Sequence, residues 1–207
     1  MSTPPLTLAD QAAQAERLLE PAVWAYLCGG AADELTLRAN LSAWQRLPLW
    51  PRVLRPLAGG HTRTTLAGHA LAPPILLAPV ALQQLAHPEG ELASALAAAA
   101  QGAGYVLSTQ SSTPLEAVAQ AVRGDPGRGP LWFQLYWQAD RGFNRALVQR
   151  AEAAGYEAIV LTADAPVQGV RDRERRAGLT PPPGVRAVHL RDAPAAPPAA
   201  GTYCAGL

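Results

Sequence analysis

Short apolar runs separated by helix-like stretches dominate the middle of the sequence. The runs open near Ile75, Gly104, Leu131 and Ala158, about 27 to 29 residues apart. Each run is apolar at successive positions, as in a strand buried on both faces, and is followed by a stretch with helical periodicity. Four strand-helix units in series predict a parallel sheet with right-handed crossovers.

The stretches between the runs carry helix start and stop signals. Pro88 is expected in the first turn of one helix, with Glu89 and Glu91 placed favourably in the field of the helix dipole. Thr113 is expected to cap the next helix, and Gly155 is expected to end the third.

The segments that flank the repeat differ from it. Helical segments are expected around residues 7–28 and 33–45, before the first strand. From Pro181 onward the chain is rich in proline and alanine and has no period, so we expect residues 184–207 to be loop or disordered. Residues 1–183 are expected to form the structured domain.

A parallel strand-helix repeat is compatible with an open doubly wound sheet and with part of a (β/α)8 barrel. A dinucleotide-binding sheet carries a G-x-G-x-x-G fingerprint after its first strand, whereas APVALQQLAHPEGE follows the first strand here. This difference favours the barrel. A complete barrel needs about 250 residues, so four units in a chain of 207 residues predict an incomplete (β/α)8 barrel preceded by N-terminal helices.

Composition and charge restrict the partners of the chain. It is 49% hydrophobic and 16% charged, as in a globular protein, and its formal net charge is +1 without blocks of one sign. We therefore expect small ligands as partners, and neither nucleic acid nor a membrane surface. The two cysteines are far apart and outside metal-ligand spacing, and no signal peptide is recognisable, so a cytoplasmic protein without a metal is expected.

Neutral hydrogen-bonding groups stand where the apolar runs end. In a barrel, ligand chemistry lies at the carboxyl ends of the strands. A ring of backbone amides, hydroxyls and a carboxamide suits a flat, neutral heterocycle better than a metal ion, which would need carboxylates, imidazoles or thiolates. The residues at these ends are Pro79-Val80-Ala81, Ser108-Thr109, Gln134 with Tyr136, and Thr162 with Asp164.

Six motifs between about Val23 and Pro183 carry a family resemblance. They are AYLCGGAADELTLRAN, LPLWPRVLR, LLAPVALQQLAHPEGE, LSTQSSTPLEAVA, WFQLYWQADR and LTADAPVQGVRDRERR. In their order and spacing, the chain closely resembles the N-terminal half of the FMN-dependent 2-hydroxy acid oxidases and dehydrogenases, the glycolate oxidase and L-lactate dehydrogenase family. The resemblance implies FMN as cofactor and oxidation of a small L-2-hydroxy acid to the 2-keto acid.

The resemblance also implies roles for individual residues. Three residues would lie along the flavin ring through their backbone, and three side chains would hydrogen-bond to its polar edge. These cofactor-binding positions are Pro79, Val80 and Ala81 for the backbone, and Ser108, Gln134 and Thr162 for the side chains.

Three further positions concern the substrate. Tyr26 and Tyr136 would face it, and Arg171 would lie near its carboxylate. Asp164 is also a family position, but we expect it to cap a loop or a helix start. His87 directly precedes Pro88, which favours a structural role in the turn over that of a catalytic base.

Parts of the family pattern do not occur in this sequence. In the family, the second half of the barrel supplies a lysine near the flavin, the histidine that takes the substrate proton, an arginine for the carboxylate and a glycine-rich phosphate site. We therefore expect the catalytic base to be absent from this chain. A noncatalytic half-barrel or a module that depends on a partner remains the alternative, and the open sheet edges favour a homo-oligomer in solution.

Overall fold

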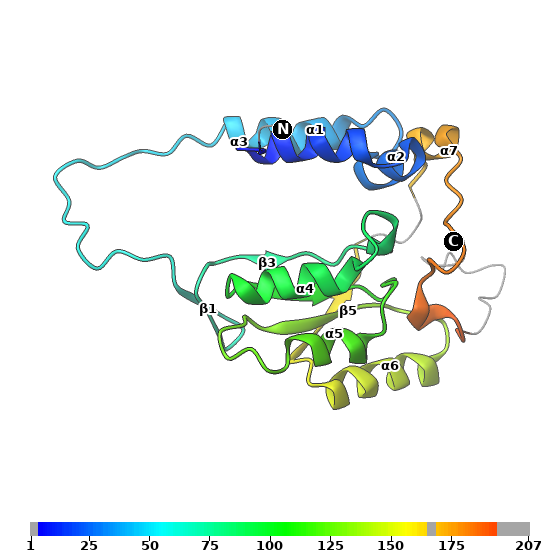
Figure 1. The fold of residues 1–207 in the computed structure, drawn as a ribbon. Helices are drawn as coiled ribbons and strands as arrows, with labels where there is room; N and C mark the ends of the chain where they lie inside the picture. The colour runs from blue at the N-terminus through cyan, green and yellow to red at the C-terminus, as the bar shows by residue number, and fades with distance from the viewer. Residues whose placement is uncertain (1–3, 165–168, 194–207) are drawn as a thin grey trace. The chain divides into compact units, whose positions relative to one another are not determined.

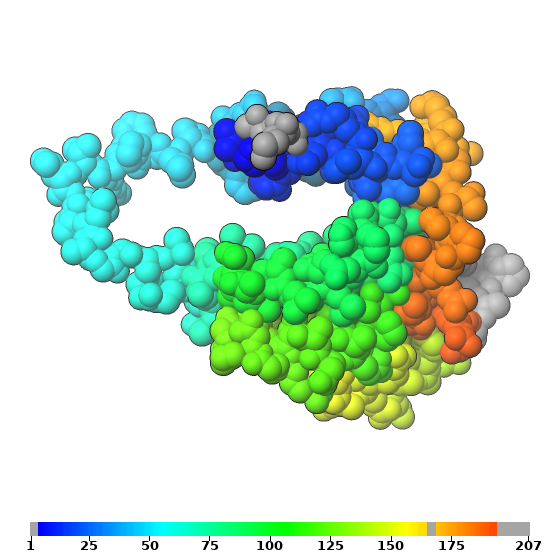
Figure 2. Space-filling view, viewed as in Figure 1, coloured from blue at the N-terminus to red at the C-terminus, as the bar shows by residue number. Residues whose placement is uncertain are grey.

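The computed structural model describes residues 4–164 and 169–193. The chain divides into two compact units. The first unit combines Met1–Leu57 with Gly169–Pro181, and the second combines Ala58–Gln168 with Pro182–Leu207. Figure 1 labels elements of both units, and Figure 2 gives the space-filling view in the same colours.

The first unit is helical. Its helices are α1 (Leu8–Leu18), α2 (Pro21–Cys28), α3 (Leu35–Gln45) and α7 (Asp172–Ala177). Thr7 and Asp10 form a capping box at the start of α1, in which each side chain accepts a hydrogen bond from the backbone N–H of the other residue. Pro21 stands in the first turn of α2 and divides the expected helical segment 7–28 into two helices.

The second unit contains the strands. Its elements are β1 (Thr64–Leu66), β2 (His69–Leu71), β3 (Leu76–Leu77), η1 (Gln83–Leu85), α4 (Gly90–Ala100), β4 (Gly104–Leu107), α5 (Leu115–Val122), β5 (Leu131–Tyr136), α6 (Arg141–Ala154), β6 (Ala158–Thr162) and η2 (Val188–Leu190). Strands β3, β4, β5 and β6 form a parallel sheet in that order, while β1 and β2 form an antiparallel hairpin. The predicted parallel sheet is confirmed, and each of its strands begins within one residue of the predicted position.

Three helices and the sheet enclose the core of the second unit. Helices α4, α5 and α6 lie side by side (Figure 1), and their apolar faces pack against alternate residues of β4 and β5. Leu107 and Phe133 are fully buried there. The prediction of burial on both faces is wrong for β6, where Ile159 is 40% and Leu161 55% exposed, because this strand lies at the edge of the sheet.

Two helix starts differ from their predictions. Helix α4 begins at Gly90, so Pro88 lies in the turn before it. Thr113 does not cap α5, whose N-cap is Pro114 without a side-chain hydrogen bond. The Thr113 hydroxyl instead donates to the buried carboxylate of Glu91 at 2.8 Å. Gly155 ends α6 as predicted, with a left-handed φ of 93° that glycine adopts without strain.

The 3-10 helix η2 lies in the part of the second unit that begins at Pro182. Within the expected tail 184–207, the described residues include η2, while residues 194–207 lie outside them. His189 in this helix is only 3% exposed. Its Nε2 atom accepts a hydrogen bond from the Leu115 N–H at 2.9 Å, and its Nδ1 atom lies 3.1 Å from the Thr109 carbonyl oxygen. These contacts hold the neutral tautomer with the proton on Nδ1.

We expect the burial of His189 to make stability depend on pH. Burial lowers the pKa of His189 below its ordinary value, although the hydrogen bond to Thr109 opposes the shift. The unfolded chain therefore binds a proton more readily than the folded one, and the free energy of unfolding falls as pH drops below about 6.5. Denaturant titrations from pH 7.5 to 5 should show this loss, and His189→Gln should flatten the slope. An unchanged slope in that variant would assign the pH dependence to other groups.

Candidate functional site

Three of the predicted ring-binding residues form one hydrogen-bonded row at the carboxyl ends of the strands. The Ser108 hydroxyl donates to Gln134 Oε1 at 3.3 Å, and Gln134 Nε2 donates to the Thr162 hydroxyl at 2.8 Å. Ser108 and Gln134 are 3% and 1% exposed, and Thr162 is half-buried. The row therefore crosses β4, β5 and β6 at the end where a barrel binds its ligand.

Strand alternation explains why a glutamine occupies this buried position. Successive residues of a strand point to opposite faces, so Phe133 and Leu135 enter the core and Gln134 points away from it. The parallel register pairs Gln134 with Val160 and Tyr136 with Thr162. Thr162 thus pairs with the residue two positions after Gln134 and lies on the same face of the sheet, within reach of the Gln134 carboxamide.

Thr109 supports the row, a role that the sequence did not reveal. Its hydroxyl donates to the Gln134 carbonyl at 2.6 Å and accepts from the Tyr136 N–H at 3.1 Å. Its own N–H donates to Gln134 Oε1 at 3.2 Å, and its side chain is fully buried. The signal in the sequence was the position of Thr109 next to Ser108 at the end of an apolar strand. This pattern predicts a strand end but no specific role for Thr109.

The donors that remain in the row determine which ligand it can hold. Ser108 uses its only proton on Gln134, whose carboxamide oxygen accepts two hydrogen bonds. Among the hydrogen bonds of the described residues, one Gln134 N–H and the Thr162 O–H are left for a ligand. These neutral donors fit the carbonyl and ring-nitrogen acceptors of a flavin and offer no charge for a metal ion.

The segment after β3 carries the three predicted backbone contacts. Pro79 and Ala81 are half-buried, and the Val80 side chain is 43% exposed. Gln83 Nε2 lies 3.4 Å from the Val80 carbonyl oxygen, a long hydrogen bond. The side chain of Val80 thus lies free of the core, which is compatible with the predicted contribution through the backbone.

Tyr136 lies in the same unit as the row. It ends β5, is half-buried, and its carbonyl accepts from Gln138 Nε2 at 3.0 Å. Asp164 is exposed and directly precedes residues 165–168, which lie outside the described residues. Its capping role stays a prediction. His87 has the expected turn contact, since its Nδ1 atom accepts from the Glu89 N–H at 3.2 Å.

Tyr26 and Arg171 contact each other in the first unit. The guanidinium carbon of Arg171 lies 5.2 Å from the centre of the Tyr26 ring, and the group donates to the carbonyls of Tyr26 and Gly29. Arg171 also pairs with Glu174 at 2.9 Å. Burial raises the pKa of the Tyr26 hydroxyl although the charge of Arg171 opposes the shift. A substrate carboxylate near Arg171 would share it with Glu174, and the substrate roles of Tyr26, Tyr136 and Arg171 stay predictions.

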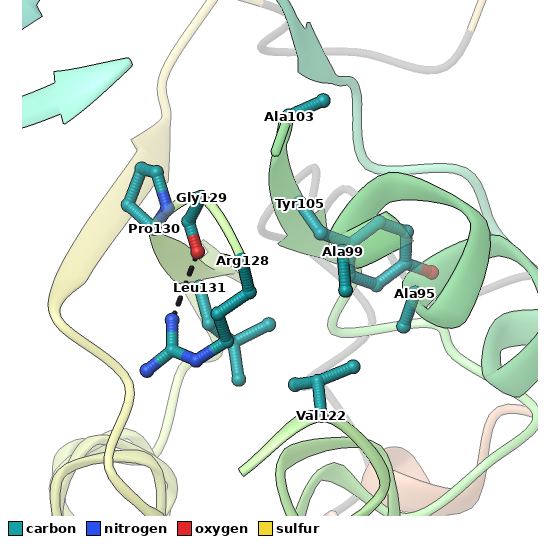
Figure 3. Close-up of a pocket in the computed structure, with 9 residues that line it drawn as sticks. All are labelled: Ala95, Ala99, Ala103, Tyr105, Val122, Arg128, Gly129, Pro130 and Leu131. Carbon is teal, nitrogen blue, oxygen red and sulfur yellow. Dashed lines mark hydrogen bonds between the residues drawn. The ribbon is translucent and has the colours of Figure 1, made fainter. Parts of the chain in front are cut away.

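A small pocket lies near the amino ends of β4 and β5. Figure 3 shows its lining, which is apolar apart from the Arg128 side chain and the Tyr105 hydroxyl. Arg128 donates to the Gly129 carbonyl at 2.9 Å and pairs with Glu157, while the Tyr105 hydroxyl accepts from Gln83. Because these polar groups have partners and the row lies at the opposite ends of the strands, we assign the pocket no ligand.

The described residues contain neither a cluster of metal ligands nor a membrane-spanning helix. Residues 4–164 and 169–193 contain no group of three or more His, Cys, Asp or Glu side chains that could hold a metal ion. No helix within these ranges combines the length and the apolar character that crossing a membrane requires.

Known proteins with similar sequences include enzymes named as oxidases and dehydrogenases. A family model for FMN-dependent dehydrogenases matches residues 15–204. The L-lactate oxidase of Roseobacter sp. (strain GAI101) is 49% identical over 193 residues, which cover 93% of this chain and 50% of that protein. The 4-hydroxymandelate oxidase of Amycolatopsis orientalis is 43% identical over 185 residues, which cover 89% of this chain and 50% of that protein.

Solved structures give the same result. The crystal structure of mandelate oxidase with (S)-2-phenylpropionate matches with a TM-score of 0.83 and 42% identity, over 89% of this chain and 53% of that one. The chain therefore spans about half the length of the curated relatives and solved structures it matches. The likeness confirms the predicted fold class, an incomplete (β/α)8 barrel preceded by N-terminal helices. On the match over residues 15–204, this chain belongs to the family of FMN-dependent dehydrogenases.

Proposed function

We propose that this chain supplies the ring-binding part of an FMN site in an enzyme that oxidises a small L-2-hydroxy acid to the 2-keto acid. The observation that carries the proposal is the row of Ser108, Gln134 and Thr162 at the carboxyl ends of neighbouring strands. These are the side chains that the family resemblance assigns to the polar edge of the flavin. Their neutral donors suit the acceptors of that edge.

The described residues that the proposal places at the site can bind and orient the ligands, but none of them is a good base at neutral pH. Bound FMN would accept the two electrons that leave the substrate with its α-hydrogen. Tyr26 and Tyr136 can donate hydrogen bonds to a substrate, yet a phenol with an ordinary pKa near 10 is a poor base at neutral pH. Burial raises the pKa of Tyr26 further. The proton acceptor is therefore expected from the part of the family fold that this chain does not span.

The named relatives support the substrate class. They include an L-lactate oxidase, a 4-hydroxymandelate oxidase and a 2-hydroxyacid oxidase, whose names share a 2-hydroxy acid. The guanidinium of Arg171, which lies over the Tyr26 ring, is the cation that would pair with the carboxylate of such a substrate. A cytoplasmic homo-oligomer remains the prediction for the assembled protein.

Joining residues 1–183 to the C-terminal half of the Roseobacter L-lactate oxidase tests this proposal. The fusion is expected to retain FMN through desalting and to show bleaching of the flavin absorbance when L-lactate is added without oxygen. Gln134→Ala should weaken FMN binding because it removes a hydrogen bond with a net contribution of about 0.5–1.5 kcal/mol. Tyr136→Phe should instead lower turnover more than it weakens FMN binding.

The two variants serve as controls for each other, because one alters the ring-binding row and the other alters a residue expected to face the substrate. A folded fusion that binds FMN, but whose flavin is reduced by neither L-lactate nor glycolate nor mandelate, would contradict the enzymatic proposal. The noncatalytic half-barrel would then be the better account. Equal FMN affinity in Gln134→Ala and the parent fusion would remove Gln134 from the site.

A further inference from the structure

A fully buried carboxylate joins the two loops that follow β3 and β4. Glu91 lies in the first turn of α4 and is 0% exposed. Its Oε1 atom accepts from the backbone N–H groups of Gln83 at 3.1 Å and Ser112 at 2.8 Å. Its Oε2 atom accepts from the hydroxyls of Ser112 at 2.7 Å and Thr113 at 2.8 Å. One side chain thus holds both loops.

The carboxylate stays ionised although these partners are all neutral. Burial alone raises the pKa of Glu91, but the hydrogen bonds from Ser112 and Thr113 outweigh it and hold the pKa below its ordinary value. Its place in the first turn of an eleven-residue helix also favours a negative charge. The sequence predicted only the favourable interaction of Glu91 with the helix dipole, which an exposed glutamate could make equally well.

The loop after β3 depends on contacts of this kind. Leu82 has a left-handed φ of 52°, a strained conformation for leucine, and its N–H donates to the Gln110 carbonyl at 3.0 Å. The next two N–H groups donate to Glu91 and to the Ser112 hydroxyl, the latter at 3.1 Å from Gln84. Three consecutive backbone N–H groups therefore attach this loop to Glu91 and to the loop after β4.

Gln83 extends these contacts to the predicted ring-binding backbone. Its Nε2 atom donates to the Val80 carbonyl at 3.4 Å and to the Tyr105 hydroxyl at 3.2 Å, while its Oε1 atom accepts from Ser94 at 2.6 Å. Its backbone is held by Glu91, so the carboxylate lies two hydrogen bonds from Val80. The other loop held by Glu91 begins with Ser108.

We propose that Glu91 is a positioning residue that sets the Pro79–Ala81 backbone against Ser108 by holding Gln83 and Ser112. The inference rests on the proposed function, in which these two loops contact the flavin ring. Glu91 itself is 0% exposed, so it would act through Gln83 and Ser112 and not by contact with the flavin. Removing its side chain would leave two backbone N–H groups without an acceptor and would release the strained loop at Leu82.

The experiment measures flavin affinity and local opening in the 207-residue chain. Lumiflavin, which has no phosphate, is titrated and its fluorescence quenching gives the dissociation constant. Amide hydrogen exchange at Leu82, Gln83 and Gln84 reports opening of the loop without any ligand. In Glu91→Ala we expect affinity to fall about tenfold, as for the loss of a well-made hydrogen bond, and exchange at these amides to rise at least tenfold.

Two further variants separate positioning from charge and from folding. Glu91→Gln can keep its carbonyl oxygen on the two backbone N–H groups and turn its NH₂ toward the Ser112 and Thr113 hydroxyls, which can accept. It should restore affinity to within about threefold of the parent chain. Gln83→Ala leaves the Glu91 contacts intact and should weaken lumiflavin binding about threefold to tenfold.

A matched destabilised control is Leu147→Ala, a buried core position on α6 that lies outside both loops. It should lower stability without changing lumiflavin affinity of the folded chain. Three results would overturn the inference. The first is a lumiflavin affinity that is unchanged in both Glu91→Ala and Gln83→Ala, and the second is a loss of affinity in Leu147→Ala as large as in Glu91→Ala. The third is a Glu91→Gln variant that binds lumiflavin as weakly as Glu91→Ala does. If the parent chain binds no lumiflavin, the proposed function fails in this chain. Exchange at Leu82–Gln84 that is unaffected by Glu91→Ala would then overturn the positioning role separately.

Discussion

Replacing Phe133 with alanine is expected to lower the free energy of unfolding of the second unit by about 3–5 kcal/mol. Phe133 is 0% exposed in the middle of β5. Its ring meets Tyr156 and His189 edge to face, with centroids 5.8 and 5.7 Å away. Alanine would leave a cavity lined by strands and helices that cannot all move inward, so both the transfer energy and the packing contacts are lost.

Urea unfolding followed by far-UV circular dichroism measures this loss. Phe143→Ala is a matched control because it makes the same chemical change at a half-buried site that packs at the edge of the core. We expect its effect to be less than half as large. Equal losses in the two variants would mean that the core is not centred on β5. Since small domains are stable by only about 5–15 kcal/mol, Phe133→Ala should also reduce the yield of folded protein.

Gly129→Ala is expected to lower the free energy of unfolding by about 3 kcal/mol or more. A methyl group at this position would lie 2.4 Å from the Ala103 carbonyl carbon, 2.5 Å from its oxygen and 2.6 Å from the Gly104 nitrogen. These atoms belong to the backbone that enters β4, so no side-chain rotation can relieve the overlap. The start of β5 would have to move away from β4, which would weaken the pairing between Tyr105 and Leu131.

Gly124→Ala is the control for this substitution. Apart from its two chain neighbours, no heavy atom of the structure lies within 4 Å of the methyl group at that position, and its φ is not left-handed. Its stability should equal or slightly exceed that of the parent chain, because alanine restricts the unfolded state more than glycine does. Chemical denaturation of both variants gives the comparison. A Gly129→Ala protein as stable as Gly124→Ala would show that the two strands can separate there without loss.

The sheet could be predicted because its strands are buried. A strand covered on both faces must be apolar at consecutive positions, which made the starts of β4 at Gly104 and β5 at Leu131 visible without any structure. The start of β6 at Ala158 was visible from the same apolar pattern, although this edge strand is partly exposed. The hairpin of β1 and β2 was missed for the opposite reason. All three residues of β1 are exposed, and the turn depends on positive φ values at Ala67 and Gly68 that alanine does not signal.

The candidate site was predictable in its residues but not in its support. Family position identified Ser108, Gln134 and Thr162, and the structure joins them by hydrogen bonds. The roles of Thr109 and Glu91 depend on partners about 20 to 25 residues away in the sequence. A threonine at a strand end and a glutamate in a first helical turn have ordinary local explanations, so nothing nearby in the sequence indicated those distant contacts.

The order of the strands in the sheet has a consequence for synthesis of the chain. Because β3, β4, β5 and β6 are neighbours in the same order as in the sequence, every strand pairs with the one made just before it. No strand has to wait for a distant partner, and each loop closure spans a single intervening helix. The growing polypeptide can therefore extend its sheet one unit at a time as it leaves the ribosome, with β6 the last of these four strands to join.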